Sequence, residues 1–308
     1  MKHKSLLMLG VSAMMLTSCE TEIINDFGPK PEAGTNSTEL TVVGSVDGIA
    51  QSRATDSSWE DGDAIGITSS ELLSNAKFTT DGSGTFTGEE GNVYFPDSYT
   101  HTFNAYYPYS DAVTNGLISF TVSGEANYNS QKAYDFMFAS SSAGLKNPVL
   151  SLTFRHKMAR LIINVSTSTE DGFSADDVFG TDGDANSSVG SFSSLYYSGI
   201  FDTSTGVVSP SSKSAEMIMS DAIDNADTHT RTYVVYVPTQ QKCKYKHTFN
   251  KGASNEQNYS VSLGTGVWQA GTSYTYNITI KKNSMDVTSS MTITDWTDNG
   301  SEDYNAVM

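Results

Sequence analysis

The sequence has few cysteines and few positive charges. Only Cys19 and Cys243 occur among its 308 residues, which is too few for a disulfide framework. The 18 lysines and arginines face 35 aspartates and glutamates, so the formal net charge is -17. A surface this acidic repels nucleic acid and favours solubility. The composition therefore argues against a nucleic-acid partner, and the length predicts one large or two ordinary domains.

The sequence also lacks the motifs of common catalytic and metal sites. It contains no Gly-x-Ser-x-Gly, P-loop or dinucleotide-binding pattern, and its histidines do not form spaced pairs that would hold zinc. Asp182-Gly-Asp-Ala-Asn186 begins like a calcium-binding EF-hand loop. However, Ser187 stands where the loop requires Gly, and Ser193 stands where it requires a bidentate Glu. A glycosidase needs two carboxylates at a set separation, which loop spacing does not show. We therefore expect no cofactor, no metal and no enzymatic activity.

Long hydrophobic runs are absent too, and the apolar run that does occur lies at the N-terminus. Lys2 and Lys4 precede apolar residues 5–16, and Leu16-Thr-Ser18-Cys19 has the form of a bacterial lipobox. The run is shorter than the roughly 20 residues that span a bilayer, so it predicts a secretion signal. We expect cleavage between Ser18 and Cys19, removal of residues 1–18, and a lipid on Cys19 that anchors the chain to the outer membrane. The alternative is an ordinary signal peptide with Cys19 near its cleavage site.

Short strands fill the rest of the chain. Residues 19–38 are polar and contain Pro29 and Pro31, which predicts a flexible tether. From residue 39 on, apolar and polar residues alternate in short segments separated by Gly, Asn, Asp or Pro, and no amphipathic helix of ten or more residues stands out. Strands are expected near residues 40–46, 63–67, 77–80, 84–87, 92–95, 100–107, 117–122, 136–139, 150–154, 161–165, 190–197, 215–220, 232–238, 244–249, 259–263, 273–282 and 291–296.

This pattern predicts an all-β protein with two sandwich domains. We place the N-terminal domain at residues 39–147, the C-terminal domain at 148–297 and a polar tail at 298–308. Cys243 has no disulfide partner if Cys19 carries lipid, and it is expected as a half-buried thiol in a strand. Its neighbours Lys242 and Lys244 do not by themselves make it a nucleophile.

An aromatic run around Pro108 leaves two interpretations open. Phe103 and Tyr107 would line a sandwich core while Tyr106 packs on the outer face. Alternatively, Tyr99, Phe103, Tyr106, Tyr107 and Tyr109 form an exposed surface that stacks on sugar rings, as in a glycan-binding lipoprotein of the cell surface.

Six segments follow the lipobox in a distinctive order. They are Arg53–Ile67 (RATDSSWEDGDAIGI), Phe103–Tyr109 (FNAYYPY), Leu152–Leu161 (LTFRHKMARL), Tyr233–Pro238 (YVVYVP), Trp268–Tyr276 (WQAGTSYTY) and Ile293–Trp296 (ITDW). Together, from about residue 39 to 297, they resemble the fimbrillin (Mfa-like) proteins of the Bacteroidales. The resemblance implies two tandem transthyretin-like β-sandwich domains and a lipoprotein pilin that is exported to the cell surface and built into fimbriae. The implied partners are other pilin subunits, and a surface receptor or glycan.

The resemblance also implies a processing step. In stalk subunits of this family, an arginine-specific protease cuts beyond the first strand, and a strand from another subunit fills the groove that opens. Arg53 alone lies in a polar junction after the first strand, so Arg53–Ala54 is the candidate bond; Arg155, Arg160 and Arg231 lie in or beside strand patterns. The alternative is that Arg53 is an uncut loop residue of an anchor or tip subunit. The short polar tail is a poor donor strand, which favours an anchor, tip or accessory role.

Overall fold

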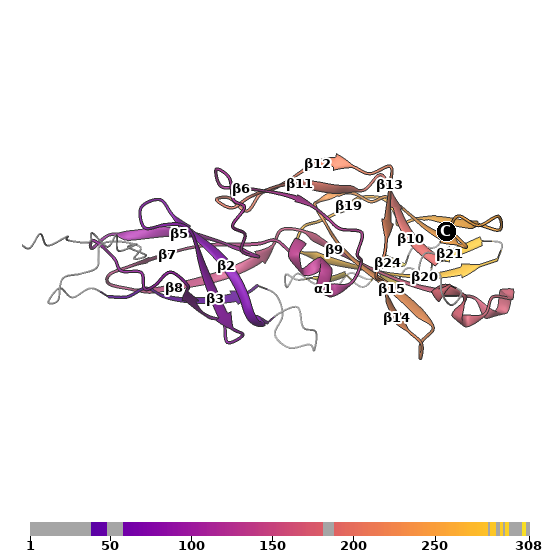
Figure 1. Ribbon diagram of the computed structural model, residues 1–308, viewed down its shortest axis with the longest axis horizontal. Coiled ribbons are helices and arrows are strands. Elements are labelled where there is room, and N and C mark those ends of the chain that lie inside the picture. Colours follow the sequence, from indigo (N-terminus) through magenta and orange to yellow (C-terminus); the bar gives the residue numbers. More distant parts are fainter. Residues whose placement is uncertain are drawn as a thin grey trace, which may run out of the picture.

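The computed structural model describes residues 38–47, 58–180 and 188–282 in full, together with short strands between residues 284 and 305. Two β-rich parts lie end to end along the long axis of the molecule (Figure 1). Helical structure in the described residues is limited to the single turn α1 (Tyr128–Gln131) and three short 3-10 segments. The prediction of an all-β fold is therefore confirmed. Within those residues, no helix is long and apolar enough to cross a membrane.

The first part is a closed barrel. Its strands are β1 (Thr41–Val46), β2 (Asp61–Ser69), β3 (Leu73–Asp81), β4 (Thr85–Gly88), β5 (Thr100–Tyr107), β7 (Met137–Gly144) and β8 (Val149–His156). They follow the order β1-β4-β3-β2-β5-β7-β8 around the barrel. β8 shows why these residues form strands, since buried Leu150, Leu152 and Phe154 alternate with exposed Ser151 and Thr153. The alternation turns one side of every strand toward a common core.

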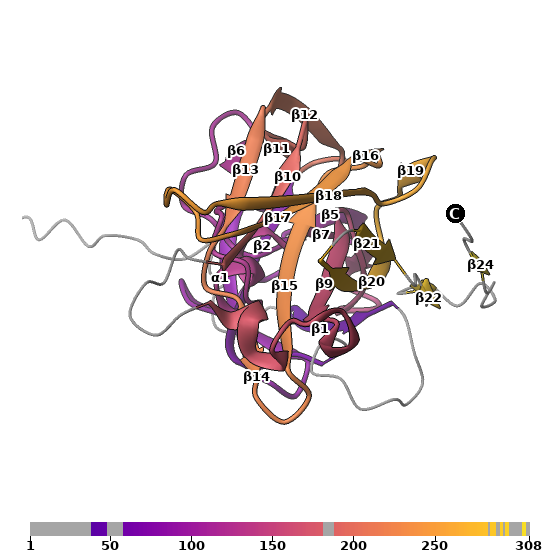
Figure 2. The same cartoon turned by 90° about the vertical axis from the view of Figure 1, so that its right-hand side faces the viewer.

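The second part packs two sheets face to face. Its main strands are β9 (Ala159–Thr167), β10 (Ser188–Ser193), β13 (Glu216–Met219), β14 (Ile223–Asn225), β15 (Thr230–Val237), β17 (Lys244–Phe249), β18 (Gln257–Ser262), β20 (Thr272–Lys281), β21 (Ser284–Val287) and β23 (Ile293–Asp295). One sheet has the order β14-β15-β9-β20-β21, with β23 also paired to β20, and the other has the order β13-β10-β17-β18. Viewed end-on, β17 and β18 run across β15 (Figure 2).

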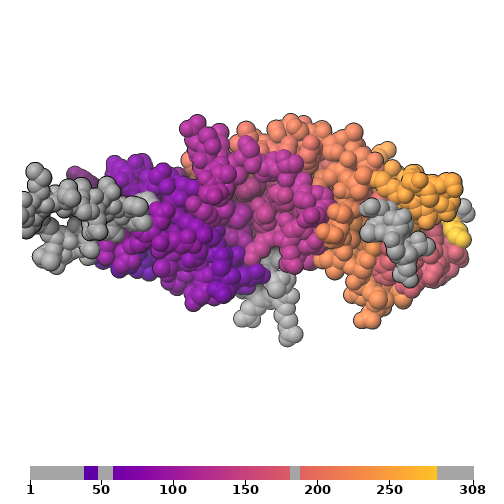
Figure 3. All heavy atoms as spheres, in the orientation of Figure 1, coloured from indigo at the N-terminus to yellow at the C-terminus, as the bar shows by residue number. Residues whose placement is uncertain are grey.

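A third sheet lies across the middle of the molecule. It consists of β6 (Leu117–Thr121), β11 (Tyr196–Asp202) and β12 (Val208–Lys213), in the order β12-β11-β6. The magenta segment that includes β6 and α1 covers the junction of the two parts in the space-filling view (Figure 3). Two short pairs complete the described strands, namely β16 (Gln240–Gln241) with β19 (Val267–Trp268) and β22 (Ser290–Met291) with β24 (Tyr304–Asn305).

The buried apolar residues form two cores. One fills the barrel, from Leu40 to Phe154, and the other fills the second part but also takes in residues of β6 and the α1 region, such as Phe120 and Phe136. The expected boundary between residues 147 and 148 lies between β7 and β8, which pair with each other in the barrel. The chain therefore enters the second core, returns to the barrel and leaves it again after β8. The transthyretin-like topology stays a prediction.

Tyr106 joins the two parts. Its neighbours Phe103, Ala105 and Tyr107 point into the barrel core, whereas Tyr106 belongs to the second core, where its ring lies 6.1 Å from that of Phe201. Its hydroxyl donates a hydrogen bond to Asn75 Oδ1 at 2.6 Å. This alternation along β5 is the one expected from the sequence, and it fixes the barrel against its neighbour.

Candidate functional site: the first strand and the pocket at its end

β1 closes the barrel through pairs on both of its edges. It is antiparallel to β4, where Val42 lies opposite Phe86, and parallel to β8 along its whole length, from Thr41 opposite Val149 to Val46 opposite Phe154. All other neighbouring strands in the barrel are antiparallel. Without β1, the facing edges of β4 and β8 would expose unpaired backbone groups to any strand able to bind there.

The side chains of this N-terminal segment anchor it in the barrel core. Leu40 and Val42 are buried there, with exposed fractions of 6% and 1%. Gly44 lies where a side chain has little room, since a Cβ at this position would be 2.9 Å from the Phe86 ring and 3.3 Å from the Phe154 ring. The inner face of this segment therefore carries apolar side chains at Leu40 and Val42 and a glycine where the aromatic rings already fill the barrel interior.

Backbone and side-chain hydrogen bonds fix the register of β1. The Gly44 amide donates to Gly84 O at 2.8 Å, and Gly44 O accepts a hydrogen bond from Trp59 Nε1 at 2.9 Å. At the end of the strand, the Asp47 amide donates to Phe154 O at 2.7 Å, and the Asp47 carboxylate accepts from Arg155 Nε at 2.8 Å. Arg155 is exposed, so its ion pair specifies the register more than it stabilises the fold.

The predicted processing residues Ser18, Cys19, Arg53 and Ala54 lie outside the described residues. The other three arginines are each held in a paired strand. Arg155 lies on β8, opposite Phe138, and Arg160 is buried on β9 between Tyr236 and Ser273. Arg231 on β15 binds Asp224 through two bonds of 2.7 Å.

The aromatic run does not form an exposed surface. Phe103, Tyr106 and Tyr107 are buried, and Tyr109 is half-buried with Lys77 Nζ 5.6 Å from its ring centroid. Tyr99 alone of the five is widely exposed, at 73%. The alternative of a sugar-binding surface made by all five rings is therefore wrong, and the interpretation of Phe103 and Tyr107 as core residues is confirmed.

One cluster of possible metal ligands occurs in the described residues, at the far end of the barrel. Ligand atoms of Glu71, Asp97 and His101 lie within 4.8 Å of one another. However, the two carboxylates contact different ring nitrogens: Glu71 Oε2 lies 3.3 Å from Nδ1, and Asp97 Oδ1 lies 3.0 Å from Nε2. A metal ion binds only one ring nitrogen and needs the other ligands on the same side. The geometry fits an imidazole held between two carboxylates.

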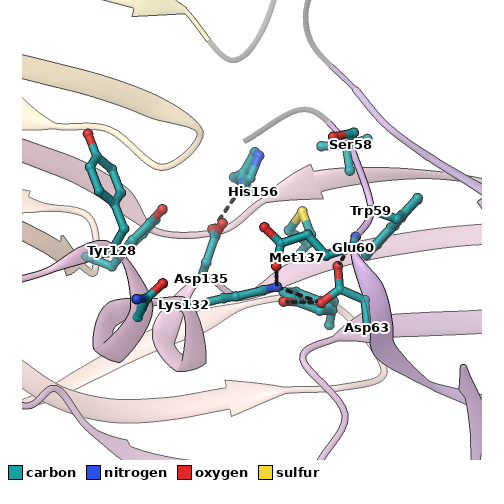
Figure 4. Close-up of a pocket in the computed structure, with 13 residues that line it drawn as sticks. Ser58, Trp59, Glu60, Asp63, Tyr128, Lys132, Asp135, Met137 and His156 are labelled. Carbon is teal, nitrogen blue, oxygen red and sulfur yellow. Dashed lines mark hydrogen bonds and ion pairs between the residues drawn. The ribbon is translucent and has the colours of Figure 1, made fainter. Parts of the chain in front are cut away.

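A pocket of about 250 Å³ lies where β1 ends, at the junction of the two parts (Figure 4). The barrel contributes Val46, Trp59 and Tyr107 to its lining, β15 of the second part contributes Tyr236, and α1 contributes Tyr128. Tyr128 lies on one side of the close-up, and Ser58, Trp59 and Glu60 lie on the other. The pocket follows from the fold, because the ends of β1, β2, β5 and β8 meet α1 and β15 at this point.

Ion pairs cross this pocket from one part to the other. Lys132 Nζ lies 2.7 Å from Glu60 Oε2 and 2.9 Å from Asp63 Oδ1. Burial lowers the pKa of Lys132, but the hydrogen bonds to Glu60 and Asp63 outweigh it and the pKa is raised overall. His156 Nδ1 lies 2.7 Å from Asp135 Oδ1. The charges that line the pocket are thus matched within the protein, which suits a structural contact and provides no activated nucleophile.

Comparison with known proteins assigns the fold to a family. The family described as fimbrillin-like matches residues 52–296. The chain belongs to the fimbrillin-like family. It is 28% identical to the protein named "Putative fimbrium subunit Fim1C" of Bacteroides uniformis, over 99% of this chain and 100% of that protein. The family and this relative indicate a structural subunit of fimbriae without enzymatic activity, located at the cell surface and assembled with other pilin subunits.

Solved structures agree with this assignment. A crystal structure from Bacteroides uniformis, described as a "putative cell adhesion protein", superposes with a TM-score of 0.64. The two proteins are 26% identical, and the match covers 85% of this chain and 100% of that one. A second, from Bacteroides ovatus and with the same description, gives a TM-score of 0.64 at 22% identity over 86% of this chain and 99% of that one, and it supports the fold. The fimbrillin-like resemblance found in the sequence is therefore confirmed.

Proposed function

We propose that this fimbrillin-like protein joins a surface fimbria by strand exchange at β1. In this proposal β1 leaves the barrel, and a strand from another subunit takes its place between β4 and β8. The observation that carries the proposal is the double pairing of β1, whose edges meet β4 and β8 while Leu40 and Val42 fill the core. An incoming strand would satisfy the same backbone groups and the same apolar sites.

Processing at Arg53–Ala54 would release β1. The bond lies in the connection between β1 and β2, so a cut there separates β1 from the rest of the barrel in sequence. The competing sites are protected, because Arg155, Arg160 and Arg231 lie in paired strands and a protease would need local unfolding to reach them. The cut would also remove Cys19, and with it the proposed lipid anchor in the outer membrane.

The role within the fimbria is proposed as tip, anchor or accessory subunit. A stalk subunit needs a donor strand for its neighbour. Here β21 and β23 both pair with β20, so the C-terminal strands complete the sheet of their own subunit. The tail at 298–308 is polar and offers few apolar residues to a neighbouring barrel. Such a subunit, once cut at Arg53, would accept a strand in place of β1 without forming long polymers.

The test is protease treatment of the protein taken from its native cell surface. An arginine-specific protease is expected to produce a new N-terminus at Ala54, detected by mass analysis, and to leave the rest of the chain intact. Arg53→Lys should abolish this cut, whereas Arg155→Lys should not change it. A cut first at Arg155, Arg160 or Arg231 would contradict the proposal for the processing site.

Strand exchange is tested separately on the cut protein. A synthetic peptide of residues 39–47 is expected to bind to cut protein after the original segment has been removed in denaturant, and the uncut protein should not take it up. An SDS-resistant ladder of multimers in the native fimbria would indicate a stalk role. A terminus at Ala54 without a ladder would indicate a tip or accessory subunit, whereas an acylated Cys19 terminus would contradict release of β1 by processing. Absence of peptide uptake by the refolded, cut protein would overturn exchange at β1.

A further inference from the structure

The pocket at the junction contains groups that strand exchange does not use. Tyr128 and Asn129 of α1 line it. Asp135 and His156 lie between Tyr128 and Ser58, which is on the barrel side (Figure 4). Tyr128 keeps 41% of its surface exposed, although rings such as Tyr107 and Tyr236 on the same pocket are buried. An exposed tyrosine ring beside polar groups offers an apolar face together with hydrogen-bonding partners.

The size of the pocket limits the ligand. Its volume of about 250 Å³ lies just below the roughly 300–1,000 Å³ of sites for drug-sized molecules. One six-membered ring with its substituents fits this space, but an extended peptide or a nucleotide does not. The pocket is open to the surface on the side of Tyr128 and Asn129, both exposed, so the ring can belong to a longer chain that continues into solvent.

The charges of the pocket limit the ligand further. Lys132 is already bound to Glu60 and Asp63, so an anionic ligand would have to break these two contacts before it gained a cation. The formal net charge of -17 also disfavours anionic ligands. A cationic ligand would compete with Lys132 for Glu60 and Asp63, and with His156 for Asp135. A neutral ligand avoids both penalties.

Hydrogen-bonding capacity for a neutral ligand is present at the rim. The contact with His156 involves Oδ1 of Asp135, and a carboxylate accepts several hydrogen bonds through its two oxygens. Asn129 is exposed and carries an amide that both donates and accepts. A hydroxyl group is a neutral partner that can both donate to a carboxylate and accept from an amide.

We propose that this junction pocket binds one neutral pyranose ring of a glycan. Tyr128 packs against the C–H face of the ring, and Asp135 and Asn129 bind its hydroxyl groups. Ser58 and Glu60 form the wall of the site on the barrel side of the ring. The site differs from the buried aromatic run around Pro108, because it is built by the meeting of the barrel with α1. It does not rest on strand exchange, since the pocket is formed with β1 in place and Val46 in its wall.

The test uses the chain from residue 20 onward, without protease treatment, and ligand-observed NMR with free monosaccharides. Glucose, galactose, mannose, fucose and N-acetylglucosamine are the neutral probes, and N-acetylneuraminic acid and lysine are the charged ones. At least one neutral sugar should give saturation transfer. Tyr128→Ala and Asp135→Asn should each weaken binding roughly tenfold or more, which corresponds to about 1.4 kcal/mol.

Tyr99→Ala is the matched control. Tyr99 is the most exposed aromatic residue described, and it precedes β5, whose other end supplies Tyr107 to the pocket. The length of that strand separates the two sites by about 25 Å. Tyr99→Ala should leave sugar binding unchanged, and thermal unfolding confirms that each variant is folded. The proposal is overturned if no neutral sugar binds, if only a charged probe binds, or if binding survives both Tyr128→Ala and Asp135→Asn.

Discussion

The Ser188 hydroxyl lies 2.9 Å from Nε2 of His247. A serine beside a histidine is the arrangement of many hydrolases, but here both residues are buried, with exposed fractions of 2% and 0%. Ser188 Oγ also donates to Val178 O at 2.6 Å, and Tyr245 OH lies 2.9 Å from His247 Nδ1. The pair therefore satisfies polar groups inside the second core, which agrees with a structural protein.

The same burial makes stability depend on pH. Burial first, and then the positive charge of Arg231, lower the pKa of His247 from 6.5 to about 3. Below pH 6.5 the unfolded chain binds a proton that the folded chain does not, so stability is fully present above 6.5 and falls as the pH drops toward 3. His247 alone is expected to lower the free energy of unfolding by about 2 to 3 kcal/mol between pH 6.5 and about 4.5.

The measurement is urea unfolding at about pH 7 and about pH 4.5 for the wild type and His247→Gln. The variant should be less stable at neutral pH because of its altered packing, yet it should lose less stability on acidification. His229→Gln is the control, since His229 is 48% exposed on a surface ion pair with Asp176. Equal acid sensitivity of all three proteins would show that His247 is not the cause.

Gly44 is expected to limit which residues the first strand tolerates. Gly44→Val would press against the Phe86 and Phe154 rings, so we expect a loss of about 1 to 3 kcal/mol in the free energy of unfolding. Ser45→Val is the matched control, because Ser45 is exposed on the outer face of the same strand, and it should change stability by about 0.5 kcal/mol or less. Chemical denaturation compares the two. Similar losses for both variants would contradict a role for the rings.

Gly66 is expected to set the junction between the two parts. Its backbone does not have the positive φ that favours glycine, but a Cβ would overlap the Tyr106 ring. Gly66→Ala should therefore cost about 1 to 3 kcal/mol through overpacking alone. In a double-mutant cycle, Tyr106→Ala removes the ring, so the alanine at position 66 should cost less in that background. Additive losses would mean that the two residues do not act on each other.

The alternation of apolar and polar residues predicts most of the strands. β1, β5 and β8 agree closely with it, because each has one face in a core. It does not predict β12, whose residues are almost all exposed, so no burial imposes the alternation. It also joins β10 and β11 into one strand, although the chain turns at Ser194, which has a φ of 60°. Closure of the barrel is not predictable either, since β1 and β8 lie more than a hundred residues apart, as the 108-residue separation of Asp47 and Arg155 shows.

Part of the candidate site can likewise be predicted from the sequence, and part of it cannot. The first strand and its place before Arg53 are readable from the sequence, because they are local. The junction pocket is not, since Val46, Asp63, Tyr128 and His156 come from separate elements that no motif connects. α1 is a single turn of four residues, too short to show a helical period. Of the two interpretations of the aromatic run around Pro108, the core is confirmed for Phe103 and Tyr107, and the exposed surface is not.

Cys243 is half-buried, as the sequence predicts, but it lies in the connection between β16 and β17 and not in a strand. It is expected to react slowly with thiol reagents in the folded protein. Burial raises its pKa to about 12, against a minor opposing effect of Lys213, so little thiolate exists at about pH 8. In a chain that begins after Cys19, Cys243 is the only thiol. Labelling with a thiol reagent should be at least about tenfold slower in the native state than in denaturant.

A Cys243→Ser, Ser83→Cys variant, with its thiol at an exposed position, should label quickly in both states. Fast native labelling of Cys243 would show that the second core opens there, and the connection between β16 and β17 would then be the first place to look for local unfolding.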